Sequence, residues 1–150
     1  MTSTSANGRA GRCRDLPPGT ATLAFVTPCS AEKDAAGAPL PAIERYTDPR
    51  IREVEAAARQ AGADFLIFSG EFGLLEASTP IPHYDHLLLA EEVREHASQV
   101  ARQLRQRGLD RILFFTAGLE KDPLLGPYHD CLEQACELAA VGLTFMELAA

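Results

Sequence analysis

Apolar residues gather in four short runs that are typical of buried β-strands. The runs are Thr20–Thr27, Asp64–Ser69, Asp110–Thr116 and Leu143–Leu148. Nearly continuous apolar runs of this length are typical of strands that are covered on both faces, as parallel strands usually are. We therefore predict four strands of a mostly parallel sheet.

Three stretches between these strands have the periodicity of amphipathic helices. Asp48 and Pro49 give the first helix an N-cap and a proline at its first position, and Gly62 ends it. The second helix is predicted from about Leu89 to Arg107 and the third from about Pro127 to Ala140. The residues expected to face the core are Ile51, Val54, Ala57, Ala58 and Ala61 in the first helix, and Val93, Ala97, Val100 and Leu104 in the second.

Strands that alternate with helices predict an α/β fold. We expect residues 20–150 to form a single domain, with one doubly wound, mostly parallel sheet and helices on both of its faces. Residues 1–19 have little to bury, and we predict a disordered N-terminal arm there. Arg9, Arg12 and Arg14 make this arm basic, so it is either a solvated tail or a segment that touches phosphates.

Right-handed crossovers place the carboxyl ends of parallel strands along one edge of the sheet, where open α/β sheets bind ligands. Three loops should meet at this edge. The first runs from Pro28 to Thr47, the second contains Ser69–Gly73, and the third contains Ala117–Gly118. The first is about twenty residues long, a length that is usually either functional or disordered inside a compact domain. We therefore predict a ligand crevice between these loops.

Small polar residues in the loops are candidates for holding an anion. Ser30 and Ser69, together with the backbone N–H groups of Gly70 and Gly73, provide donors that suit a phosphate or a carboxylate. Gly70 is expected to let a ligand approach the backbone, and Gly73 to permit the turn that follows. Gly118 is a further candidate for ligand binding in the third loop.

Reactive side chains lie in the same loops. Cys29 is either a nucleophile with a lowered pKa or a packed structural thiol. Lys33 either neutralises an anion or activates a carbonyl, unless it is a flexible surface residue, and Glu71 is the best candidate for a general acid or base. Tyr84 and Asp85 are candidates for orienting a ribose or a base, with Tyr84 stacking on it; the alternative is that Tyr84 pins a proline-rich loop to the core.

Composition excludes several classes of protein. The net charge of −7 disfavours a broad nucleic-acid interface, which normally needs a basic face. No apolar run approaches the length of a membrane span and the N-terminus lacks the apolar core of a signal peptide, so we expect a cytoplasmic protein without membrane contact. The four cysteines have no zinc-finger spacing, and a closed metal site is not expected from His83, Asp85 and His86 on an irregular segment. We predict no metal and no cofactor.

Two of the loops resemble a known pattern. Pro28-Cys29-Ser30-Ala31-Glu32-Lys33, then Tyr46-Thr47, and then Ser69-Gly70-Glu71-Phe72-Gly73-Leu74-Leu75 followed by Pro82-His83-Tyr84-Asp85 resemble a small bacterial family. Its members carry Cys-Ser-x-x-Lys after the first strand and Ser-x-x-Tyr-Gly-Leu-Leu with Pro-Tyr-Asp after the second. The pattern is also similar to YaaA-type peroxide-stress proteins and, more distantly, to a domain of archaeosine synthase, which acts on a deazapurine base in tRNA.

The resemblance covers about residues 22 to 116, with two departures. Phe72 replaces the usual tyrosine, and His83 intervenes between Pro82 and Tyr84. The helix-hairpin-helix element suggested for DNA contact in YaaA-type proteins has no counterpart in this sequence, so DNA binding is not carried over.

Two functional hypotheses follow from these patterns. The first is a small α/β protein that acts on or binds an anionic or nucleotide-like small molecule, which means a nucleotide, a nucleoside or a modified base. The second is a non-catalytic stress-response or nucleic-acid-associated binding protein of the YaaA type, which the acidic net charge disfavours. The sequence leaves open whether the protein is an enzyme, and it leaves the oligomeric state open.

Overall fold

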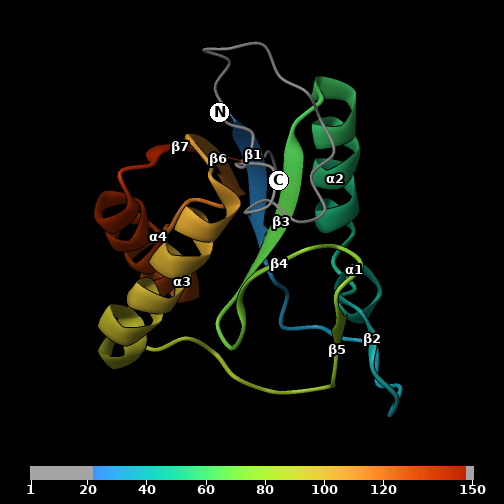
Figure 1. Cartoon of the computed structure of the whole chain (residues 1–150). Helices are drawn as coiled ribbons and strands as arrows, with labels where there is room; N and C mark the ends of the chain where they lie inside the picture. Colours follow the sequence, from blue (N-terminus) through green and yellow to red (C-terminus); the bar gives the residue numbers. More distant parts are fainter. Residues whose placement is uncertain (1–21, 148–150) are drawn as a thin grey trace.

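The computed structural model describes residues 22–147 and contains a five-stranded sheet with helices packed against it (Figure 1). The strand order is β4-β3-β1-β6-β7, and every neighbouring pair except β3 and β4 is parallel. This confirms the α/β class and the mostly parallel sheet. The strands are β1 (Leu23–Pro28), β3 (Asp64–Ser69), β4 (Gly73–Leu75), β6 (Arg111–Thr116) and β7 (Gly142–Glu147). The predicted arm at residues 1–19 lies outside the described residues.

The edge strand β4 corrects the sequence prediction, which treats this stretch as part of a glycine-rich loop. Gly73 has a φ of 75°, a left-handed conformation that allows the chain to reverse directly after β3. The returning segment pairs with β3 in antiparallel register, and its Leu74 and Leu75 are buried. Gln103 accepts a hydrogen bond from the Leu74 N–H at 2.8 Å, which fixes β4 against the second long helix.

Three long helices occupy the predicted positions: α2 (Pro49–Ala61), α3 (Val93–Arg107) and α4 (Gly126–Ala139). Asp48 caps α2 as expected, and its carboxylate accepts from the Arg50 N–H at 3.0 Å. The structure corrects two details. Ala57 and Ala61 are exposed, and short 3-10 turns, η2 (Ala90–Glu92) and η3 (Pro123–Leu125), precede α3 and α4. None of the helices in residues 22–147 has the length and apolar character needed to cross a membrane.

The helices cover both faces of the sheet (Figure 1). Side chains alternate along each strand, so that Val26 and Phe114 pack with α3 and α4, whereas Phe25 and Leu113 pack with α2. The α3–α4 side holds the larger apolar cluster. Both faces of the central strands are therefore buried, as their apolar sequences predict.

The long connection after β1 is ordered, although its length suggested a functional or a disordered loop. It contains β2 (Leu40–Pro41) and the single-turn α1 (Ala42–Arg45), and β2 pairs with β5 (Pro80–Ile81) in a separate antiparallel sheet. This small sheet and α1 lie beyond the ends of β1 and β3 (Figure 1). A bridge between Lys33 and Tyr46 closes the base of the connection.

Arg45 holds this connection in place from the inside. Its side chain has no exposed surface. The guanidinium donates to the carbonyl oxygens of Asp34 at 2.6 Å, Ala36 at 2.9 Å, Ala38 at 2.8 Å and Ile81 at 3.3 Å. One buried side chain thus ties residues 34–38 to β5.

Candidate functional site

Cys29 lies directly after β1, at the carboxyl end of the sheet. Its backbone N–H donates to the Phe68 carbonyl at 2.9 Å, which extends the β1–β3 pairing by one residue. The thiol is partly buried and interacts with the backbone N–H of Gly70 from the neighbouring strand end. The first two predicted loops therefore meet at this sulfur atom.

All three tyrosines of the chain converge on Cys29. Tyr84 and Tyr128 lie close enough to the thiol for their hydroxyl groups to act on its pKa, and the Tyr46 hydroxyl bonds to that of Tyr84. Tyr46 comes from the end of the long connection, Tyr84 from the segment before η2, and Tyr128 from the first turns of α4. Three distant parts of the sequence thus supply one cluster.

A network of hydroxyl groups links these tyrosines to the end of β3. The Tyr84 hydroxyl bonds to the Ser69 hydroxyl at 2.9 Å and to the Tyr46 hydroxyl. Ser69 is fully buried, and its oxygen accepts from the backbone N–H groups of Glu71 and Phe72 at 3.0 Å each. Ser69 therefore fixes the turn and supports Tyr84, and these bonds already occupy its hydroxyl group.

Lys33 brings a positive charge to the cluster. Its Nζ lies 4.7 Å from the centre of the Tyr84 ring and 5.9 Å from that of Tyr46, within the range of cation–π attraction. The same ammonium group lowers the pKa of Cys29 through its charge. Lys33 therefore lies in the same cluster as Tyr46 and Tyr84, and its role in a site stays a prediction.

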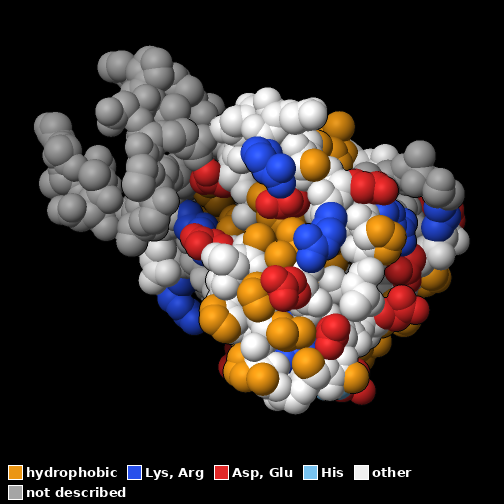
Figure 2. Space-filling model, turned by 90° about the vertical axis from the view of Figure 1, so that its right-hand side faces the viewer, with side chains coloured by type: hydrophobic (Ala, Val, Ile, Leu, Met, Phe, Trp, Pro, Cys, Tyr) orange, Lys and Arg blue, Asp and Glu red, His pale blue; other side chains and the backbone are white. Residues whose placement is uncertain are grey.

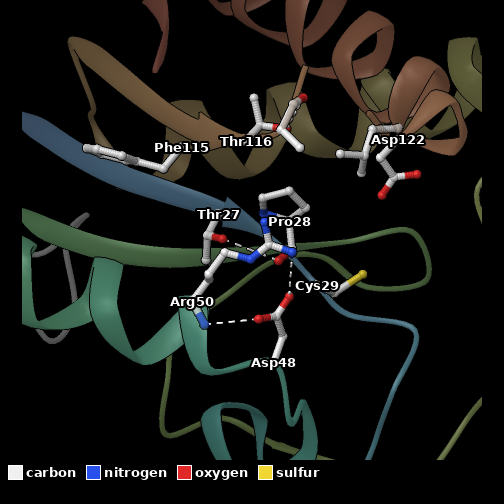
Figure 3. Close-up of a pocket in the computed structure, with 10 residues that line it drawn as sticks. Thr27, Pro28, Cys29, Asp48, Arg50, Phe115, Thr116 and Asp122 are labelled. Carbon is white, nitrogen blue, oxygen red and sulfur yellow. Dashed lines mark hydrogen bonds and ion pairs between the residues drawn. The ribbon is translucent and has the colours of Figure 1, made fainter. Parts of the chain in front are cut away.

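A pocket with a cavity volume of about 60 Å³ opens beside Cys29, between the carboxyl ends of β1 and β6 (Figure 3). Arg50 reaches toward Pro28 from the first turn of α2, and Asp122 lies across from it on the loop after β6. The Arg50 guanidinium has only a loose ion pair with Asp48, at 3.4 Å, and its side chain is 46% exposed. The remaining lining residues are Thr27, Phe115, Thr116, Ala117 and Leu125.

Burial and hydrogen bonding oppose each other at Cys29. Burial raises the pKa of its thiol, which favours the neutral form. The Gly70 N–H, the Lys33 charge and the hydroxyls of Tyr84 and Tyr128 act in the opposite direction. The tyrosines keep their protons, because burial raises the pKa of Tyr46 to about 12 and also raises the pKa values of Tyr84 and Tyr128. Their hydroxyl groups therefore stay neutral hydrogen-bond donors.

The other described cysteines have a simpler environment. Cys131 and Cys136 are buried in the apolar cluster on the α3–α4 side, and burial raises the pKa of each thiol to about 12. They have the environment of structural thiols, whereas Cys29 alone among the cysteines of residues 22–147 is accessible and surrounded by donors.

Several predicted site residues lie apart from the sulfur. The Ser30 hydroxyl donates to its own loop, at the Glu32 carbonyl, with a distance of 2.7 Å. Asp85 is exposed, and Gly118 lies against the carboxylates of Glu120 and Glu147 at the far side of the loop after β6. Gly73 is buried beneath Gln103 and serves the turn.

Glu71 belongs to a second polar group at the rim. Its carboxylate lies 2.5 Å from Nδ1 of His86, whose Nε2 contacts the Glu92 carboxylate at 3.0 Å. These hydrogen bonds to Glu92 and Glu71 raise the pKa of His86. No group of three or more His, Cys, Asp or Glu side chains in residues 22–147 is arranged to hold a metal ion.

Sequence reasoning missed three residues of the site: Tyr46, Arg50 and Tyr128. Tyr46 appears in the family-like pattern, but the pattern assigns it no role. Arg50 follows a helix N-cap after a predicted strand, which is a usable signal for a crevice residue. No sequence pattern near Tyr128 indicates a role in the site. Tyr128 lies about 100 residues after Cys29, and only the packing of α4 brings it near.

Comparison with protein-family models, curated proteins and solved structures found no match. The side chains of the site are therefore the basis for inferring its chemistry. A thiol surrounded by donors lies next to a pocket with one guanidinium, one carboxylate and two threonine side chains. Such a pocket can bind a small polar molecule and bring one of its atoms close to the sulfur.

A buried histidine behind the pocket should make stability depend on pH. His129 bonds through Nε2 to the Thr116 hydroxyl at 2.9 Å, and burial lowers its pKa. The unfolded chain therefore binds a proton to this residue at a higher pH than the folded chain does. The contribution of His129 to stability should be constant above about pH 6.5 and should fall as the pH drops below it. The total loss is about 1.4 kcal/mol for each unit by which folding lowers the pKa of His129.

Urea denaturation at pH 7.5 and pH 5 checks this expectation. His129→Gln should lose less stability between the two pH values than the wild type, because the coupled proton is removed. His86→Gln is the matched control with the opposite sign, since the raised pKa of His86 stabilises the fold at low pH and that contribution fades as the pH rises through it. Equal pH dependence in His129→Gln and the wild type would contradict the expectation.

Proposed function

We propose that this protein binds a small nucleotide-like molecule, which means a nucleotide, a nucleoside or a modified base, in the pocket between β1 and β6. The observation that carries the proposal is the position of this pocket, at the carboxyl ends of two adjacent parallel strands with Cys29 at its edge. Ligands of α/β sheets bind where neighbouring strands send their connections to opposite faces.

The path of the chain around the pocket supports this proposal. β1 leads to α2 on one face of the sheet, whereas β6 leads to α4 on the other face (Figure 1). We infer a doubly wound domain in which the connections diverge between β1 and β6. The gap that such divergence leaves coincides with the pocket.

Charge in the pocket favours a ligand that carries an anionic group and a polar heterocycle. The Arg50 guanidinium has donors to spare and suits a phosphate or a carboxylate. Thr27, Thr116 and Asp122 line the same space and can pair with the donors and acceptors of a base or a ribose. Phe115 adds an apolar surface.

The face of the molecule in Figure 2 gives no support to a nucleic-acid-associated role. On the face shown in Figure 2, basic and acidic side chains are interspersed, and no continuous basic stripe is visible. With a net charge of −7, a binder of long nucleic acids would need such a stripe to neutralise several phosphates.

A thermal-shift screen tests the proposal. Nucleoside monophosphates, nucleosides, phosphate and sulfate are each added to the wild type, to Arg50→Gln and to Arg59→Gln. A ligand at about 100 times its Kd stabilises the folded state by about 2.7 kcal/mol, which corresponds to a rise of several degrees in Tm. We expect this rise in the wild type and in Arg59→Gln, whose arginine lies on the exposed side of α2. Arg50→Gln should lose most of it.

A flat response of the wild type to every compound would rule out the proposed ligand class. An equal response of Arg50→Gln and the wild type would place the ligand outside this pocket.

A further inference from the structure

We propose that Thr116 is a hydrogen-bond acceptor for the ligand of this pocket, and that His129 is the positioning residue that turns the hydroxyl proton of Thr116 away from the ligand. The chemistry that fits is an N–H or O–H donor, such as the amino group of a base or a hydroxyl group of a ribose. This inference deepens the proposed function, and it rests on that function for the view that a nucleotide-like molecule enters the pocket.

Thr116 is the last residue of β6 and lies on the side of the pocket opposite Arg50 (Figure 3). Its side chain follows Ile112 and Phe114 on the face of the sheet that α3 and α4 cover, because side chains alternate along a strand. Only 3% of its surface is exposed. The hydroxyl group therefore depends on partners within the protein or in the pocket.

The Thr116 hydroxyl has two acceptors within reach. Nε2 of His129 lies 2.9 Å from the oxygen, and the Ala117 carbonyl oxygen lies 3.4 Å from it. The imidazole is held in place by the rings of Phe114 and Phe145, whose centroids are 5.8 Å and 4.9 Å from its own. A hydroxyl has a single proton, and the shorter contact is the better hydrogen bond. The proton therefore goes to Nε2, and the lone pairs of the oxygen stay available to the pocket.

This polarity needs a His129 ring with a bare Nε2 and a proton on Nδ1. Burial lowers the pKa of His129, so the ring is neutral near pH 7 and has one N–H and one bare nitrogen. The charged groups that act on the ring are the carboxylates of Glu133 and Asp130 on α4 and of Asp122 on the loop after β6. Their negative charge stabilises an N–H on the ring, and Nδ1 is the nitrogen left to carry it because Nε2 contacts Thr116.

Protonation of His129 reverses the bond. Both ring nitrogens then carry a hydrogen, so Nε2 donates to the Thr116 oxygen and the hydroxyl proton turns elsewhere. A donor on the ligand then meets an oxygen that is already occupied. The pocket should therefore bind such a ligand at full affinity above about pH 6.5 and lose affinity as the pH falls through the lowered pKa of His129.

Nitrogen NMR of the histidine rings tests the polarity without any ligand. The chemical shifts of Nδ1 and Nε2 distinguish a protonated ring nitrogen from an unprotonated one, and the spectrum of His129→Gln assigns the signals. At pH 7.5 the ring of wild-type His129 should carry its proton on Nδ1. A proton on Nε2 would overturn the proposal.

Adenosine is the probe for the ligand, because it has both kinds of donor and no phosphate whose own titration would change the binding. Thr116→Val should weaken adenosine binding about tenfold at pH 7.5, as measured by calorimetry. Thr116→Ser keeps the hydroxyl and should restore the affinity. Thr144→Val is the matched control, since Thr144 is exposed on β7. Deoxyadenosine lacks a ribose hydroxyl and purine riboside lacks the amino group, so the compound that binds wild type and Thr116→Val equally identifies the donor.

The pH profile is the readout that a merely structural role would not move. Wild-type affinity for adenosine should fall below about pH 6.5 toward that of Thr116→Val, whose own affinity should stay flat. Equal affinity and equal pH dependence in the two proteins would overturn the proposal. If Thr116→Val does not fold, the wild-type profile decides alone, and a flat profile is the contradicting result.

These outcomes are distinct from those of the thermal-shift screen. A proton on Nδ1 of His129 together with no binding of any compound would support the hydroxyl polarity and reject the nucleotide-like ligand. Binding together with a proton on Nε2 would do the reverse.

Discussion

Arg45→Met should lower the free energy of unfolding by about 3 kcal/mol or more. The buried guanidinium makes four hydrogen bonds to carbonyl oxygens, and a charged donor contributes about 1.5–3 kcal/mol to each such bond. Methionine fills the volume but leaves those carbonyls without their donors. Part of the loss is recovered because residues 34–38 are exposed and their carbonyl groups can turn to water.

Urea denaturation measures this loss, with Arg59→Met as the control. Arg59 lies on the exposed side of α2 and pairs with Glu55 one turn away, so its removal should cost about 0.5 kcal/mol or less. Arg45→Lys should be nearly as damaging as Arg45→Met, since an ammonium group does not reproduce the planar fork. If Arg45→Met were as stable as Arg59→Met, Arg45 would not be what holds the long connection.

Gly70→Ala should destabilise the protein by about 2 kcal/mol. The added Cβ would lie 2.8 Å from the Tyr128 hydroxyl oxygen, 3.1 Å from the Leu88 Cβ and 3.2 Å from the Leu88 nitrogen. Leu88 and Tyr128 are both buried and bonded to each other, so neither moves away without breaking that bond.

Gly126→Ala is the control for this variant, because a Cβ at Gly126 meets nothing within 4 Å in the described structure. Alanine there should leave stability unchanged or raise it by about 0.5 kcal/mol, since Gly126 begins α4. Thermal and urea unfolding of the two variants provide the comparison. A Gly70→Ala protein as stable as Gly126→Ala would mean that the contacts around Gly70 are looser than described.

Gly70 has a structural reason to lack a side chain. The sequence predicts that a ligand approaches the backbone at this position, and that stays a prediction. The structure shows that the Tyr128 hydroxyl of the same chain lies where a Cβ would be. A small residue at a strand end signals close approach, but the approaching group comes from elsewhere in the fold.

Local patterns were sufficient for most elements of the fold. The apolar runs predicted β1, β3, β6 and β7, and the Asp48–Pro49 cap and the apolar periodicity predicted α2, α3 and α4 to within a few residues. These features depend on interactions between residues close in sequence, namely capping, side-chain periodicity and turn conformation. The same reasoning placed Cys29 directly after the first strand, because the end of a buried strand is marked by the strand's own sequence.

Tertiary structure alone decided how these parts meet. The pairing of β1 with both β3 and β6 creates the pocket, and the antiparallel return of β4 follows from one left-handed glycine. Tyr46, Tyr84 and Tyr128 gather near Cys29 because the long connection, the segment before η2 and α4 all pack at the same end of the sheet. The sequence by itself therefore determined the elements and the position of Cys29, since these depend on neighbours along the chain. The donors around Cys29 depend on contacts between residues far apart in sequence, and only packing brings those residues together.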